Sequence, residues 1–131
     1  MNTQDIQSED WQDFCEKFTY FNRGSLLTVE VIGSDGVRSD FARDLPLDKM
    51  TFDTTDACND MITISLESAP GERKMNHFVI DPRYLRIRRA EAGKKLLEIG
   101  SENGTTLVTF HSGRFPQTNN FSAEKRFVIP S

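Results

Sequence analysis

The sequence predicts an α+β fold, in which an N-terminal helix packs on a curved, mainly antiparallel meander sheet of about seven strands. Apolar residues recur at helical spacing up to residue 22, and after Gly24 the pattern changes to alternation. Turn-forming residues then separate the alternating segments at short intervals. Connections this short cannot carry a parallel crossover, so we expect antiparallel pairing. The pattern leaves open whether the sheet stays open or closes into a barrel.

The expected helix runs from Ser8, as its N-cap, to Asn22. Asp13 and Lys17 are spaced as an i,i+4 ion pair on its exposed side, and Gly24 supplies a left-handed stop after the last turn. The face that must be buried carries Trp11, Phe14, Cys15, Phe18 and Phe21.

The strands are expected in short, alternating segments bounded by Gly, Pro, Asn and Asp. Gly33–Gly36 reads as a hairpin turn, and Asn103-Gly104 suits a tight turn because both residues tolerate positive φ. The proline in 44–47 is expected to interrupt pairing because it has no N–H to donate. The expected strands are 25–32, 37–43, 49–54, 61–68, 74–80, 85–90, 95–100 and 105–111.

We expect the 131 residues to form one domain, residues 1–111, followed by a flexible C-terminal tail, residues 112–131. Within the tail, 126–130 has the composition of an extra strand that would pair with an exposed sheet edge. No apolar run approaches the roughly 20 residues of a membrane span, and the polar N-terminus lacks the pattern of a secretion signal. We therefore expect a cytoplasmic protein that does not bind membranes.

Charge is distributed unevenly along the chain. Residues 1–60 hold 13 acidic and 5 basic side chains, and residues 61–131 hold 7 acidic and 11 basic ones. The acidic half disfavours general attraction to nucleic acid, whereas the basic half would attract anions if its side chains converge. Cys15 and Cys58 have no partner spacing typical of zinc, so both are expected to be free thiols.

The most distinctive surface feature is a basic cluster around residues 83–95. On a strand, Tyr84, Arg86 and Arg88 point away from the apolar side. Together with Lys94 and Lys95 they are candidate binding residues, because a tyrosine beside arginines can stack a base and hold phosphate. The alternative is that these cations protect an edge and form cross-strand pairs with residues such as Glu98 or Glu102.

His77 is the candidate for enzyme chemistry. Alternation places it on one face with Met75 and Val79, opposite Asn76, Phe78 and Ile80. A core histidine bonded to a backbone carbonyl, a solvent-facing residue and a general base all fit this position, and the last needs a nucleophile or an acid nearby. His111 meets it only if the strand order allows. With two histidines and two unrelated cysteines, we expect no metal site and no cofactor.

Several segments in a fixed order carry a family resemblance. They are a helix from Trp11, Leu27–Val31, Asp44–Leu47, Thr51–Asp53, Met61–Ile64, Asn76–Pro82, Leu96–Ile99 and Asn103-Gly104 leading to 107–110. Over 11–110 the chain resembles the bacterial family DUF5335, a domain of unknown function. That resemblance implies no activity, cofactor or partner.

These observations favour a non-enzymatic protein-interaction domain that binds another protein or itself through a sheet edge, aided by the tail. The first alternative is an anion or single-stranded nucleic-acid binder using the Tyr84, Arg86 and Arg88 face. The second is an enzyme using His77.

Overall fold

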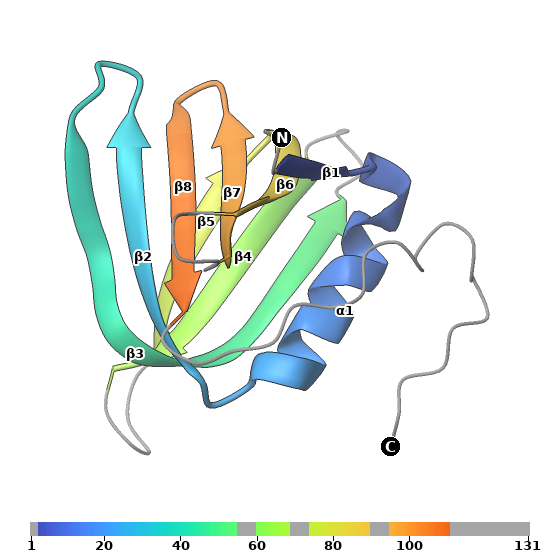
Figure 1. Cartoon of the computed structure of the whole chain (residues 1–131), viewed down its shortest axis with the longest axis vertical. Helices are drawn as coiled ribbons and strands as arrows, with labels where there is room; N and C mark the ends of the chain where they lie inside the picture. The colour runs from blue at the N-terminus through green and yellow to red at the C-terminus, as the bar shows by residue number, and fades with distance from the viewer. Residues whose placement is uncertain (1–2, 55–59, 69–73, 90–94, 111–131) are drawn as a thin grey trace.

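One helix and eight strands are formed by the residues that the computed structural model describes, which are 3–54, 60–68, 74–89 and 95–110 (Figure 1). A 3-10 turn (Ser8–Asp10) precedes the helix α1 (Trp11–Asn22). The strands are β1 (Thr3–Ile6), β2 (Leu26–Gly33), β3 (Arg38–Thr54), β4 (Asp60–Glu67), β5 (Lys74–Ile80), β6 (Pro82–Arg89), β7 (Lys95–Ser101) and β8 (Gly104–Phe110).

All strands pair antiparallel in the order β1-β6-β7-β8-β2-β3-β4-β5. Two meanders, β2 to β5 and β6 to β8, are joined by the pairing of β8 with β2. Among the described strands, the sheet is therefore open and ends at β1 on one side and at β5 on the other.

The sheet folds over on itself, so that its two ends form separate layers. β4 and β5 pass behind β6, β7 and β8, and the second half of β3 lies beside β4, next to α1 (Figure 1). In this arrangement β4 lies across from β6, and β5 across from β7. A single residue, Asp81, carries the chain from β5 to β6 with φ of 56°, a left-handed conformation that aspartate tolerates. The alternating apolar residues of the two layers face each other and form the core.

The bend is built into β3 by three irregularities in its pairing. At the first irregularity, Phe41 is an extra residue opposite Val29. Asp44, with φ of 58°, lies at the second register shift. Asp48 is the extra residue at the third. Extra residues of this kind bend and twist a strand. As a result, one 17-residue strand pairs with β2 in its first half and with β4 in its second.

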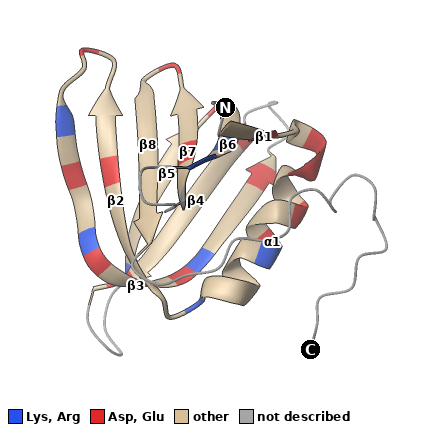
Figure 2. Cartoon of the chain, viewed as in Figure 1, with Lys and Arg blue, Asp and Glu red and all other residues tan. Residues whose placement is uncertain are grey.

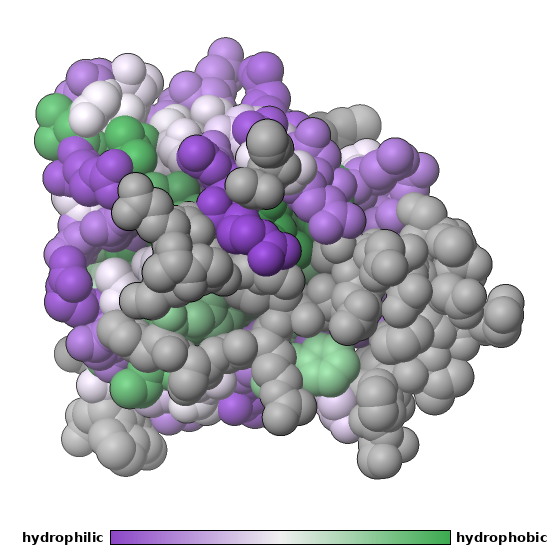
Figure 3. All heavy atoms as spheres, viewed as in Figure 1, coloured by the Kyte–Doolittle hydropathy of each residue, from purple (hydrophilic) through white to green (hydrophobic). Residues whose placement is uncertain are grey.

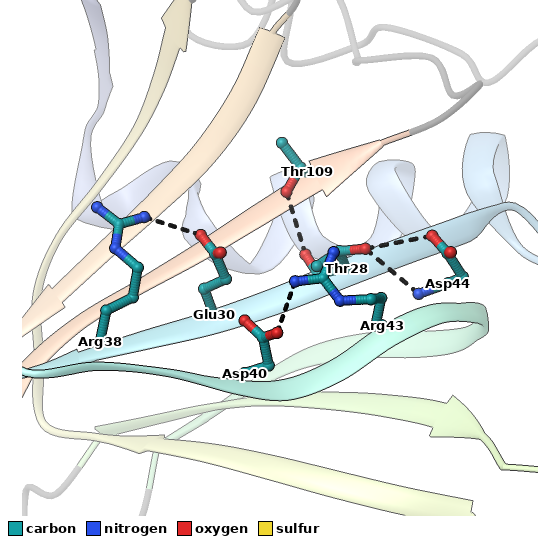
Figure 4. Close-up of polar contacts among 7 residues, drawn as sticks. All are labelled: Thr28, Glu30, Arg38, Asp40, Arg43, Asp44 and Thr109. Carbon is teal, nitrogen blue, oxygen red and sulfur yellow. Dashed lines mark hydrogen bonds and ion pairs between the residues drawn. The ribbon is translucent and has the colours of Figure 1, made fainter.

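Side chains on the outer face support the second shift (Figure 4). The Asp44 N–H donates to the Thr28 hydroxyl oxygen at 3.3 Å, and the hydroxyl lies 3.4 Å from Asp44 Oδ1. Thr109 in turn donates to the Thr28 carbonyl at 3.4 Å. The same face carries the ion pairs Arg38–Glu30 at 3.0 Å and Arg43–Asp40 at 2.5 Å. Both signs of charge alternate along this part of β3, so the face carries no field of one sign (Figure 2).

Helix α1 packs along the second half of β3 and closes the core on that side (Figure 1). Trp11 meets Phe52 edge to face at 5.6 Å, and Phe18 meets Phe110 at 5.3 Å. The predicted apolar face is confirmed, since Trp11, Phe14, Cys15 and Phe18 are buried and Phe21 is half-buried.

Two details of the predicted helix are wrong. Ser8 is not the N-cap but opens the 3-10 turn, because the Trp11 indole N–H donates to the Ile6 carbonyl at 2.8 Å and fixes a tight entry into α1. Lys17 does pair with Asp13 at 2.6 Å, but its side chain is buried rather than exposed. A lysine stem can pack on apolar neighbours while its ammonium group reaches a carboxylate.

The strands differ from prediction in two places. Segments 37–43 and 49–54 belong to one bent strand, and Pro46 is accommodated where β3 changes partner, opposite the first residue of β2. The strand β1 was not expected, because Thr3, Gln4 and Asp5 are polar and only Ile6 reaches the core. Residues 112–131, Cys58 and His111 lie outside the described residues, so the predictions about them stay predictions.

Candidate functional site

The predicted alternation on β6 is confirmed. Leu85 and Ile87 are buried in the core, while Tyr84, Arg86 and Arg88 lie on the opposite, outer face. Their neighbours on that face come from β1 and β7, the strands that flank β6. This places carboxylates on both sides of the cationic row.

Glu98 binds two members of this row from β7. The Tyr84 hydroxyl donates to Glu98 Oε2 at 2.6 Å, and Arg88 Nη1 donates to Oε1 at 2.9 Å. Glu98 is only 7% exposed, so both of its oxygens are held by these partners rather than by bulk water. Desolvation, followed by the hydrogen bond to this carboxylate, raises the pKa of the Tyr84 phenol above its usual value. The phenol is therefore a donor throughout the physiological range.

The Tyr84 ring also fixes the residue beside it. A Cβ on Gly100 would lie 2.1 Å from the ring, so only glycine fits at this position of β7. The Arg86 guanidinium lies 3.9 Å from the ring centroid, a cation–π contact. One face of the Tyr84 ring is thus already covered by a cation.

Arg86 is paired as well. Its Nε lies 3.0 Å from Asp5 Oδ1 on β1, although this ion pair lacks hydrogen-bond geometry. Arg83 pairs with Glu102 at 3.5 Å. The predicted cross-strand pairs with Glu98 and Glu102 are therefore present.

The structure does not test the other two proposed members of the binding row. Lys94 lies outside the described residues, and Lys95 is described only as part of the β7 backbone. A phosphate would have to compete with Asp5 and Glu98 for the arginines. This geometry supports charge neutralisation rather than an open anion site.

His77 faces the core, on the inner side of β5. Its Nε2 lies 2.9 Å from the Thr106 hydroxyl of β8, and its ring lies 5.0 Å from that of Phe41. Of the three interpretations, a histidine that faces the core is therefore correct, but its partner is a hydroxyl and not a backbone carbonyl. Burial lowers the pKa of His77 below its usual value. Thr106 is only 4% exposed, and together with His77 it lines an open hollow.

A hollow of about 140 Å³ opens beside this pair. It is lined by residues 77–80 of β5, by Val31 of β2, by the end of β7 and its turn, and by residues 104–106 of β8. Residues 77–80 are consecutive and alternate between the two faces of β5, so the hollow lies along the backbone of this strand.

The edge strand β5 carries an apolar outer face. Phe78 is 51% exposed and Ile80 is 58% exposed, and they alternate with the buried Val79. Lys74 pairs with Asp48 at 3.4 Å. Among the described strands, β5 pairs only with β4, so its other backbone edge is unpaired.

Asp81 shows which groups that edge offers. Its N–H donates to the Asp60 carbonyl at 2.7 Å, next to the pairing of Ile80 with Met61. In an antiparallel ladder, alternate residues bond to the same neighbour. The residues two and four positions before Asp81, Val79 and His77, therefore face β4. The backbone groups of Lys74, Asn76, Phe78 and Ile80 point outward.

A family model for DUF5335 matches residues 2–117. The chain belongs to this family of unknown function. No curated protein and no solved structure matches it. In this DUF5335 fold, the segments that carried the resemblance have structural positions: Leu45–Leu47 lies at the bend of β3, Asn76–Pro82 contains the switch between layers, and Leu96–Ile99 lies in β7.

Three other features were sought among the described residues: a metal site, a membrane-crossing helix and a reactive cysteine. Within residues 3–54, 60–68, 74–89 and 95–110, no three His, Cys, Asp or Glu side chains are grouped so as to hold a metal ion. In those ranges, no helix has the length and apolarity that a membrane crossing needs. Cys15 is a buried free thiol whose pKa is raised by burial, which makes it unreactive.

The β5 edge was missed by sequence reasoning at the level of residues. The alternation that sets Phe78 and Ile80 apart from His77 is visible in the sequence. Which side faces water depends on where β5 lies in the sheet. The sequence alone does not show that Phe78 and Ile80 are exposed. An edge was expected to carry the interaction, but no residue of that edge was named.

Proposed function

We propose that this DUF5335 domain is a protein-interaction module in which the β5 edge accepts an extended segment as an additional strand. The observation that carries this proposal is the edge of β5 that no other described strand pairs with, beside which Phe78 and Ile80 are exposed. Backbone hydrogen bonds to the edge would supply affinity, and contacts with these two side chains would supply selectivity.

The chemistry of β5 supports this use. Edge strands are normally protected by Lys, Pro, bulges or short length. β5 has seven residues, no proline and no bulge in its pairing with β4, and its cation Lys74 stands at one end, already paired with Asp48. Burying one large apolar side chain contributes roughly 1.5–3 kcal/mol, so Phe78 and Ile80 are sufficient anchors for a small interface.

Apolar exposure is not confined to β5. In Figure 3 most of the coloured surface is hydrophilic, and one of its hydrophobic patches lies near the end of the β2–β3 hairpin. That hairpin contains Val37, which is 63% exposed but belongs to a turn and offers no strand edge. Val37 is therefore a matched control for the apolar exposure of Phe78.

Selection from a displayed library of random peptides tests the proposal. We expect enrichment of extended peptides with alternating apolar residues, which lose binding to the double variant Phe78→Glu, Ile80→Glu and keep it with Val37→Glu. Enriched peptides that bind the double variant equally well, or no enrichment, would contradict it. Circular dichroism confirms that each variant is folded.

A deletion variant tests separately whether the C-terminal tail contributes to peptide binding. Deleting residues 112–131 is expected to leave peptide binding intact if β5 alone forms the site, and to reduce it if the tail contributes. We place the interaction in the cytoplasm, in keeping with the buried free thiol of Cys15.

A further inference from the structure

We infer that the strand added to β5 is β5 of a second copy of this chain, paired antiparallel across a twofold axis. This inference rests on the proposed function and names its partner. A closed dimer requires a surface that complements itself, since the same residues must meet from both sides. The β5 edge meets this requirement in its backbone, its charges and its side chains.

The backbone of β5 can pair with itself along its whole length. The outward-facing residues are Lys74, Asn76, Phe78 and Ile80, as the bond between Asp81 and Asp60 indicates. With the axis at His77, Lys74 faces Ile80 of the other copy and Asn76 faces Phe78. Each of these residues has an N–H and a carbonyl, so no pair lacks a donor.

The charges of the strand are complementary in this alignment. β5 begins with the cation Lys74 and is followed by Asp81, which lies beside Asp60. Lys74 and Asp81 are both exposed. Antiparallel pairing brings Lys74 of each copy next to the acidic end of the other, whereas parallel pairing would bring like charges together.

The side chains fit on both faces. On the outer face, the Phe78 rings of the two copies are diagonal neighbours, a spacing within reach of aromatic side chains. On the inner face, Met75 of one copy lies opposite Val79 of the other. The hollow of about 140 Å³ beside residues 77–80 offers room there, and the flexible side chain of Met75 adapts to such space.

The mass of the full chain by light scattering, over a range of concentrations, tests the inference. We expect a dimer that dissociates on dilution, and Phe78→Glu is expected to raise its dissociation constant by more than about 100-fold because one change removes two anchors. The control Val37→Glu is expected to dimerise like the parent chain. Circular dichroism shows whether both variants keep the fold.

Cysteine cross-linking in a Cys58→Ser background tests the register. A mixture of the Asn76→Cys and Phe78→Cys proteins is expected to form a mixed disulfide faster than either protein alone forms a symmetric one. Faster symmetric linkage would overturn the proposed alignment.

A monomer at all concentrations would overturn the inference, as would a dimer unaffected by Phe78→Glu or one that is lost only when residues 112–131 are deleted. If selected peptides still bind at Phe78 and Ile80 in any of these cases, the proposed function stands and only its partner is wrong. Peptides that bind elsewhere would contradict the function itself.

Discussion

The two edges of the sheet, β1 and β5, are built in opposite ways. β1 has four residues, exposes Thr3, Gln4 and Asp5, and is held by the indole of Trp11 at the Ile6 carbonyl. β5 has seven residues and exposes Phe78 and Ile80. Short, polar edges resist further pairing, whereas long, apolar ones invite it. This difference supports the proposal that β1 terminates the sheet and that β5, whose second edge no described strand pairs with, accepts a further strand.

The largest effect on this comparison is expected from Trp11→Ala. Trp11 is buried, packs on Phe52 and donates to Ile6, so its loss should lower the free energy of unfolding by about 3–5 kcal/mol. Urea denaturation measures the loss. The backbone amides of β1 should exchange faster while those of β4 stay protected, and unchanged exchange in β1 would show that Trp11 does not hold this edge. Gln12→Ala, at an exposed site of α1, is the control and should cost less than about 0.5 kcal/mol.

A smaller effect is expected from Gly100→Ala. The new Cβ would overlap the Tyr84 ring, which must move and release Glu98, at a cost of about 1–3 kcal/mol. Thermal or urea unfolding checks this value. In a Tyr84→Ala background the same substitution should be nearly neutral, and an equal cost in both backgrounds would rule out the ring as the cause.

Arg86→Ala is expected to lower the unfolding free energy by only about 1 kcal/mol. It removes an ion pair to the exposed Asp5 and a contact with the Tyr84 ring, each of which is worth little in water. With Arg88→Ala added, affinity for single-stranded RNA in a filter-binding assay should not change, because these arginines already bind carboxylates. A loss of salt-dependent RNA affinity would instead support the nucleic-acid alternative.

The pH dependence contributed by His77 is the subtlest effect. Its pKa is lowered by burial, so the unfolded chain binds the proton more tightly than the folded one. The stability that comes from keeping His77 neutral is therefore fully present above pH 6.5, the ordinary pKa. It is lost as the pH falls toward and through the lower pKa of the folded state. Urea unfolding at several pH values should show this decline, and His77→Gln should reduce it; an identical slope in the variant would assign the effect to other groups.

Much of the fold follows from local pattern. The apolar residues of α1, the strand β5 and the turn at Gly33–Gly36 are predicted closely, since helical and alternating periodicity are properties of neighbouring residues. Pattern failed for β1, whose polar residues are stabilised by pairing with β6 far along the chain. The pattern also predicted two strands where β3 is a single one, because bulges let the strand continue through Pro46.

In the candidate site too, some features follow from local pattern and others only from the tertiary structure. Alternation by itself determined that Tyr84, Arg86 and Arg88 share one face of β6 and that His77 shares its face with Val79. Only the tertiary structure decided that the arginines meet Asp5 and Glu98, that His77 meets Thr106, and that β5 lies at an edge. Side-chain direction is set by the period of the strand, whereas exposure and partners depend on which distant strand lies alongside.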